Sequence, residues 1–147
     1  MPHLISRCDL SAVQHQPAPS VRGQSDRRSG GHTDAARTRS LHHNPKTGKD
    51  KKFDGWGLID TEDLFAAVKP RRHVKAMVFG HTHHWGVDQI DGIHLINLPA
   101  LGRVFQKHEP LGWVDATLSP NGVKLELRAL DAKHKAHGET HQLKWRA

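Results

Sequence analysis

The strongest constraint on the fold is a short, mostly apolar run that ends at a group of histidines. Residues 74–79 read Val-Lys-Ala-Met-Val-Phe, and Gly80 follows them. His81, His83 and His84 then fall within four positions. A run of this length that is bounded by a glycine predicts a buried strand. Open α/β sheets bind ligands in the crevice beyond the carboxyl ends of such strands, so the histidines stand where a site is expected.

The spacing of these histidines predicts which of them act together. His81 and His83 are expected to face one point, because side chains two positions apart on an extended chain point the same way. His84 would then turn away. Two converging imidazoles are typical of a metal site, although the alternative is a polar loop in a chain with 14 histidines. A side chain at Gly80 is expected to crowd the turn or a ligand.

The composition limits the core and the kinds of partner. Hydrophobic residues make up 35% of the 147 positions, so a core that runs through the whole length is not expected. The net charge of +7 favours phosphate-bearing partners, with a solvated basic surface as the alternative. Cys8 is the single cysteine, which excludes a disulfide framework and fits the reducing cytoplasm. The sequence has neither a membrane-length apolar run nor the apolar region of a signal peptide, so no membrane partner is expected.

Residues 1–40 differ in composition from the rest of the chain. They contain six arginines and no lysine, whereas eleven lysines and five arginines follow from Leu41 onward. This first segment also lacks glutamate and aromatic residues, and we predict that it is disordered. A basic arm for nucleic acid is not favoured, because no aromatic side chain is present to stack on bases. The switch from arginine to lysine also supports the hypothesis that residues 1–40 come from a shifted reading frame.

Order is expected from Leu41, where an extended His42-His43-Asn44-Pro45 segment begins. A helix is predicted from an Asp60 N-cap to Pro70. Apolar alternation around Asp91-Gly92 predicts a hairpin, and two further strands follow it. A polar tail closes the chain. The ranges are 87–90 and 93–96 for the hairpin, 113–118 and 123–130 for the strands, and 131–147 for the tail. This order indicates an α/β fold that becomes rich in strands toward its C-terminal end.

Two histidine motifs together resemble the calcineurin-like metallophosphoesterases. A segment His-His-x-Pro, one helix, and a buried strand that ends in Gly-His-Thr-His are similar to the last two of that family's five metal-binding blocks. The resemblance covers about residues 41–130. It implies an α/β domain, namely the C-terminal part of a metallophosphoesterase-type β-sandwich flanked by helices. The disordered segment 1–40 would precede this domain, and the tail 131–147 would follow it.

The resemblance also assigns metal ligands. His42 matches the histidine of the fourth block, and the neighbouring His43 stays open as an alternative. His81 matches the fifth-block histidine that shares a metal with the fourth-block histidine, whereas His83 matches the one that binds the other metal. Two divalent ions (Mn, Fe or Zn) are implied. The hairpin 87–96 and the later strands would form the second sheet, beneath the site.

The implied activity is hydrolysis of a phosphomonoester or phosphodiester by a hydroxide that two metal ions activate. The family's Asp-x-His, Gly-Asp-x-x-Asp and Gly-Asn-His blocks are absent before Leu41. We therefore assign no catalytic residue and expect hydrolysis only from a complete or complemented enzyme. The alternative is a non-catalytic fragment that binds a metal or a polyanion. A third interpretation is an unstable fragment with an open sheet edge.

Overall fold

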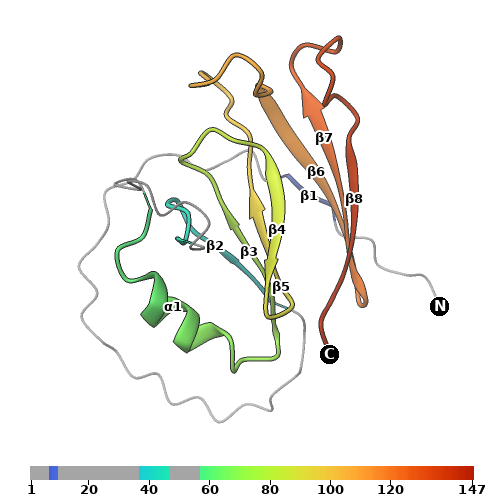
Figure 1. Cartoon of the computed structure of the whole chain (residues 1–147). Coiled ribbons are helices and arrows are strands. Elements are labelled where there is room, and N and C mark those ends of the chain that lie inside the picture. Colours follow the sequence, from blue (N-terminus) through green and yellow to red (C-terminus); the bar gives the residue numbers. More distant parts are fainter. Residues whose placement is uncertain (1–6, 10–36, 47–56) are drawn as a thin grey trace, which may run out of the picture.

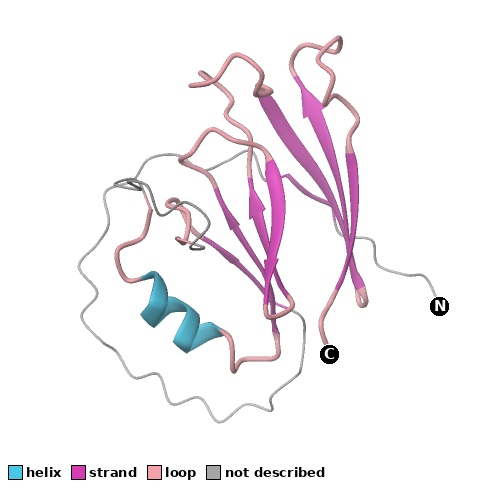
Figure 2. Ribbon diagram, in the orientation of Figure 1, coloured by secondary structure: helices cyan, strands magenta, loops and turns pink. Residues whose placement is uncertain are grey.

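The computed structural model describes residues 7–9, 37–46 and 57–147, and they form two sheets and one helix (Figure 1). The mixed sheet has the strand order β2-β3-β5-β4, and the antiparallel sheet has the order β1-β6-β7-β8. Figure 2 shows how strongly strands dominate over helix. The elements are β1 (Arg7–Asp9), β2 (Arg37–Ser40), α1 (Thr61–Val68), β3 (Val74–Phe79), β4 (Gly86–Ile90), β5 (Ile93–Asn97), β6 (Gly112–Ser119), β7 (Gly122–Ala129) and β8 (Thr140–Lys144).

Strand β3 lies at the centre of the mixed sheet and is buried on both faces, which confirms the predicted strand. Val74, Met77 and Phe79 belong to the core cluster beneath the helix. Ala76 and Val78 belong to the cluster between the two sheets. The molecule therefore has three layers, with α1 on one face of the mixed sheet and the antiparallel sheet on the other (Figure 1).

The helix α1 forms where the sequence predicts it, and it covers the mixed sheet with Phe65 and Val68. Asp60 is the N-cap residue, but its side chain makes no capping hydrogen bond. The expected side-chain cap is therefore wrong in detail, and the Asp60 carbonyl instead accepts the backbone N–H of Leu64 at 2.9 Å. This helix, which is the single one among the described residues, is too short and too polar to cross a membrane.

The predicted hairpin is confirmed, because β4 and β5 pair in antiparallel register around the turn. Asp91 and Gly92 have φ angles of 48° and 76°, as a tight two-residue hairpin turn requires. Its assignment to the second sheet is wrong, since β5 pairs in parallel with β3. The reason is that β5 is buried on both faces, with Ile93 and Leu95 toward the helix and Ile96 toward the antiparallel sheet.

The last strand corrects the predicted polar tail of residues 131–147, because β8 pairs with β7 along five residue pairs. Its exposed and half-buried positions alternate, and Leu143 packs against the core between the sheets. The buried His94 on β5 donates a hydrogen bond to the Lys144 carbonyl at 2.7 Å. The sequence did not predict β8, because Leu143 and Trp145 are the few large apolar residues in the segment 131–147.

Two short strands, β1 and β2, lie within the segment 1–40 that was predicted to be disordered. Strand β2 begins four residues before Leu41, the predicted start of order, and pairs in parallel with β3. Strand β1 pairs with β6. The rest of the predicted disordered segment 1–40 lies outside the described residues.

The close pairing of β6 and β7 supports a stability prediction at Gly112. A Cβ atom there would lie 2.2 Å from the Arg128 carbonyl oxygen, so Gly112→Ala must push two paired strands apart. We expect the free energy of unfolding to fall by about 1–3 kcal/mol in urea titrations. The control is Gly102→Ala, whose Cβ would meet nothing within 4 Å and should change stability by less than about 0.5 kcal/mol. Equal losses in both variants would contradict the packing.

Candidate metal centre

A pocket of about 420 Å³ opens at the carboxyl end of β3. Its walls come from the segment after β2, the loop after β3, the loop after β5 and the start of β6. His42, His81 and His83 all line it, together with Arg103. This position matches the crevice beyond the strand ends in which α/β sheets bind ligands.

Three imidazoles at this end of β3 form one cluster, and two of them, His42 and His81, line the pocket. Each of His42, His43 and His81 offers a ring nitrogen, and these three atoms lie within 4.8 Å of one another. Nδ1 of His81 and Nε2 of His42 are 3.1 Å apart. The rings of His43 and His81 also touch, with centroids 4.0 Å apart. The structure thus brings together two neighbouring histidines that follow β2 and one histidine from the loop after β3.

Backbone pairing holds this cluster in place. The N–H of Leu41 donates to the Val78 carbonyl at 2.8 Å, and the N–H of Gly80 donates to the His42 carbonyl at 3.2 Å. These two hydrogen bonds continue the parallel β2–β3 ladder past the end of both strands. His42 and His81 therefore leave adjacent strands at the same edge of the sheet.

Thr61 fixes the far end of the histidine segment, a role that the sequence analysis missed. Its side chain is buried at the start of α1, and its hydroxyl donates to the Leu58 carbonyl at 2.7 Å. The same oxygen accepts the N–H of Lys46 at 2.9 Å. The Leu58 N–H in turn donates to the Asn44 carbonyl at 3.0 Å. A threonine right after the expected N-cap was the available signal.

The loop after β3 does not follow the extended path that the sequence analysis assumed. His81 and His83 have φ angles of 68° and 56°, which lie in the left-handed region. The i and i+2 argument for their convergence therefore fails, because it holds only for extended chain. The expected crowding of the turn at Gly80 is also wrong, since a Cβ there would meet nothing within 4 Å.

His83 lies apart from the three-histidine cluster, although it lines the same pocket. Its ring stacks on Phe105, with centroids 4.3 Å apart and planes inclined by 7°. Its Nδ1 atom is buried and has no hydrogen-bond partner among the described residues. A buried polar atom without a partner is costly, so this nitrogen is suited to a ligand.

His84 is not part of the pocket lining, and its ring contacts Glu109, a residue that the sequence alone did not indicate. The Nδ1–H of His84 donates to one carboxylate oxygen of Glu109 at 2.5 Å. The N–H of Trp85 donates to the other carboxylate oxygen at 3.1 Å. His108 lies 3.5 Å from the first oxygen. The buried Glu109 therefore holds the end of the loop that carries His81 and His83.

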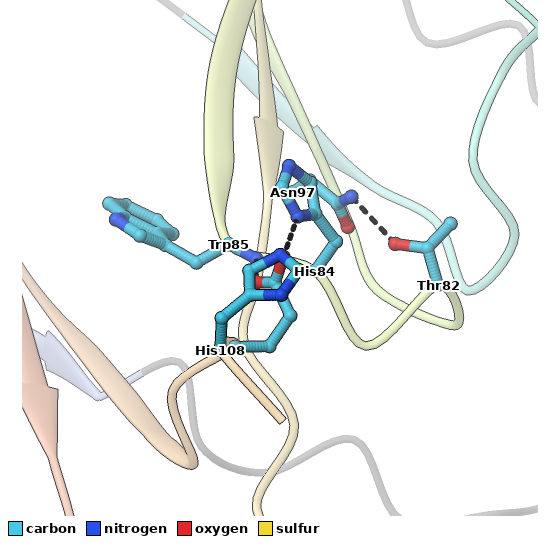
Figure 3. A network of polar contacts seen from close by, with 6 residues as sticks. Thr82, His84, Trp85, Asn97 and His108 are labelled. Carbon is cyan, nitrogen blue, oxygen red and sulfur yellow. Dashed lines mark hydrogen bonds and ion pairs between the residues drawn. The ribbon is translucent and has the colours of Figure 1, made fainter. Parts of the chain in front are cut away.

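The environment of Glu109 keeps its carboxyl group ionised. Burial opposes the charge and by itself would raise the pKa. Hydrogen bonds from His84 and from the Trp85 backbone, with the positive charges of His84 and His108, outweigh that effect and lower the pKa below its ordinary value. A second contact steadies the same loop, because the side-chain amide of Asn97 donates to the Thr82 hydroxyl at 2.6 Å (Figure 3).

The residues present fit a divalent metal ion. Imidazole nitrogens suit zinc, manganese and iron, and zinc–nitrogen bonds of about 2.0–2.1 Å place two ligand atoms about 3.3 Å apart in a tetrahedral site. The 3.1 Å separation of the His42 and His81 nitrogens is close to that value. Nδ1 of His83 offers a further ligand atom, because it has no hydrogen-bond partner among the described residues.

Comparisons with known proteins place the fold. No protein-family model matches the sequence, and a search of curated proteins finds no match. Among solved structures, the chain is similar to GAP50, the anchor in the inner membrane complex of Plasmodium, with a TM-score of 0.52 and 15% identity over 72% of this chain and 35% of that one. This likeness shows a shared fold.

Two further solved structures resemble the chain. Vacuolar protein sorting 29 from Cryptosporidium parvum has a TM-score of 0.45 and 19% identity over 61% of this chain and 46% of that one. A dimetal phosphatase from Danio rerio has a TM-score of 0.47 and 15% identity over 62% and 26%. The chain thus spans less than half the length of each of these three proteins.

Removing the Glu109 carboxylate tests its hold on the histidine loop. At pH 7, Glu109→Ala leaves the Trp85 N–H without its acceptor and should cost about 1–3 kcal/mol of unfolding free energy. The matched control is Glu139→Ala, which breaks an exposed carboxylate–histidine pair and should cost less than about 1 kcal/mol.

The same pair of variants carries a pH prediction. Because the folded-state pKa of Glu109 lies below its ordinary value of 4.5, its stabilising contribution is fully present above that pH. The contribution is lost as the pH falls through the lower folded-state pKa. Urea titrations at descending pH should therefore bring wild type and Glu109→Ala together in acid. A difference that grows below pH 4.5 would contradict this assignment.

Proposed function

We propose that this chain carries the last two metal-binding blocks of a calcineurin-like metallophosphoesterase. The supporting observation is the convergence of His42, His43 and His81 within 4.8 Å at the carboxyl end of β3. His83 lines the same pocket, and its buried Nδ1 atom has no hydrogen-bond partner among the described residues. The motif resemblance gives His42, His81 and His83, and the geometry supports two of these residues, His42 and His81, as members of one cluster that His43 joins.

The ligands divide into two groups. His81 and either His42 or His43 would hold one divalent ion, and His83 would contribute to the other. Manganese, iron or zinc suits these nitrogens. When bound, two such ions supply an activated hydroxide and neutralise the charge of a phosphoryl group. The protein's own part is to hold the imidazoles, through the β2–β3 hydrogen bonds on one side and Glu109 on the other.

Hydrolysis of a phosphomonoester or phosphodiester would require ligands that these histidines cannot supply. Each ion normally takes four or more ligands, and the Asp-x-His, Gly-Asp-x-x-Asp and Gly-Asn-His blocks are absent from the sequence. Among the described residues no strand lies on the outer side of β2, so further strands of a complete sheet could add there. We therefore propose activity for the complete or complemented protein, working in the reducing cytoplasm.

A non-catalytic fragment that binds a metal or a polyanion is the second candidate function. It is favoured by the pocket lining, in which no described residue carries a carboxylate. Such a fragment would use its histidines and its net charge of +7 without specific geometry. His134, which lies outside the pocket and carries no metal role in the proposed site, separates the two candidates.

Calorimetric titration with Zn²⁺ tests the proposed ligands. His81→Ala removes the imidazole that contacts both other cluster histidines, and we expect the affinity to fall at least about tenfold. His134→Ala removes an imidazole outside the cluster and should leave the affinity unchanged. His84→Ala also leaves the cluster nitrogens in place but removes the contact with Glu109, so it should lower the affinity less than His81→Ala does.

The pair His42→Ala and His43→Ala decides which neighbour is the ligand. We expect the larger loss from His42→Ala, because its Nε2 lies 3.1 Å from Nδ1 of His81, a separation that suits two ligands of one ion. A larger loss from His43→Ala would transfer the ligand assignment to that residue. If His134→Ala weakens uptake as much as His42→Ala, the metal site is wrong and nonspecific binding is right.

A further inference from the structure

Arg103 stands out on the wall of the pocket. It lines the same cavity as His42, His81 and His83, and its side chain is exposed. No ion pair joins it to a carboxylate anywhere in the described ranges, whereas Arg128 on β7 pairs with both Asp115 and Glu126. A guanidinium is a fixed positive charge with a planar fork of donors, so an exposed one at a cavity wall is available to an anion.

An aromatic ring holds this guanidinium in place. The Arg103 guanidinium carbon lies 5.3 Å from the centroid of the Phe105 ring, a cation–π contact. The same ring stacks on His83 at 4.3 Å. Phe105 itself stays 54% exposed, so burial in the core does not explain its position. The ring instead links the arginine to His83, a proposed metal ligand on the wall of the same pocket.

The charge of the cavity points to the ligand's chemistry. Its described lining combines three histidines and Arg103 with apolar and small residues, and no carboxylate balances them. A cavity of about 420 Å³ admits a small anion together with part of an attached group. Guanidinium groups bind phosphoryl oxygens by two parallel charge-assisted hydrogen bonds.

We infer that Arg103 is an anion-binding residue that takes a phosphoryl oxyanion at the wall of this pocket, with Phe105 as its positioning residue. This inference rests on the proposed function for its choice of phosphate as ligand. Arg103 would orient the phosphoryl group by contacts separate from the metal ligands. It would therefore affect the binding of the anion while leaving metal uptake unchanged.

Titration of the full chain with inorganic phosphate tests the inference, with Zn²⁺ present and with Zn²⁺ absent. Arg103→Gln should weaken phosphate binding at least about tenfold, because it removes a charged bidentate donor. Arg103→Lys keeps the charge without the fork and should restore only part of the affinity. The matched control is Lys107→Gln, which removes one positive charge from the same loop outside the pocket lining and should change little.

Two outcomes overturn the inference. One is wild-type protein that binds no phosphate under either condition. The other is Lys107→Gln weakening phosphate binding as much as Arg103→Gln, which would leave only the general field of the protein. Zn²⁺ titration of Arg103→Gln separates this inference from the proposed function. Arg103→Gln that takes up Zn²⁺ normally but has lost phosphate binding supports the role of Arg103. Wild-type protein that takes up no Zn²⁺ contradicts the proposed metal site. In that case the phosphate titration without Zn²⁺ still tests Arg103.

Discussion

Burial of β3 on both of its faces is the constraint on which the rest of the structure depends. Its side chains alternate between the core beneath α1 and the core between the sheets, so one six-residue strand serves two hydrophobic clusters. Each fully buried apolar side chain contributes about 1.5–3 kcal/mol, and Met77 and Val74 are essentially inaccessible. A strand held in this way has a fixed end, and that end is where the histidine loop begins.

The parallel pairing of β2 with β3 turns this fixed end into a site. Parallel neighbours finish at the same edge of a sheet, so residues that follow them meet even when they are distant in sequence. His42 and His81 are 39 positions apart, yet their ring nitrogens lie 3.1 Å from each other. The helix between them returns the chain to the start of the next strand, as a crossover between parallel strands requires. The site is therefore a product of topology more than of local sequence.

The sequence predicted features that depend on local pattern. The apolar run of β3, the Asp91-Gly92 turn and the apolar stripe of α1 each follow from nearby residues, and each is confirmed. The predictions that proved wrong concern which strands, distant in sequence, pair with each other. The placement of β5 beside β3 depends on which sheet buries its second face, and β8 depends on β7 as a template.

The site shows the same division between local and distant information. His42, His81 and His83 were singled out by motif, and all three line one pocket. The backbone that presents them was mispredicted, because the extended path assumed for this loop does not hold where His81 and His83 adopt left-handed φ angles. Glu109 and Thr61 were missed because a carboxylate or hydroxyl that anchors a loop has no signature until its distant partner is known.

Glu109 connects two of the loops that line the pocket. It belongs to the loop that carries Arg103 and Phe105, and its carboxylate accepts hydrogen bonds from the end of the loop that carries His81 and His83. The stack of Phe105 on His83 joins the same two loops a second time. The two loops that line the cavity are therefore joined at both of these places. If a bound metal ion changes the affinity of the pocket for an anion through these contacts, the anion must change the affinity for the metal ion by the same factor.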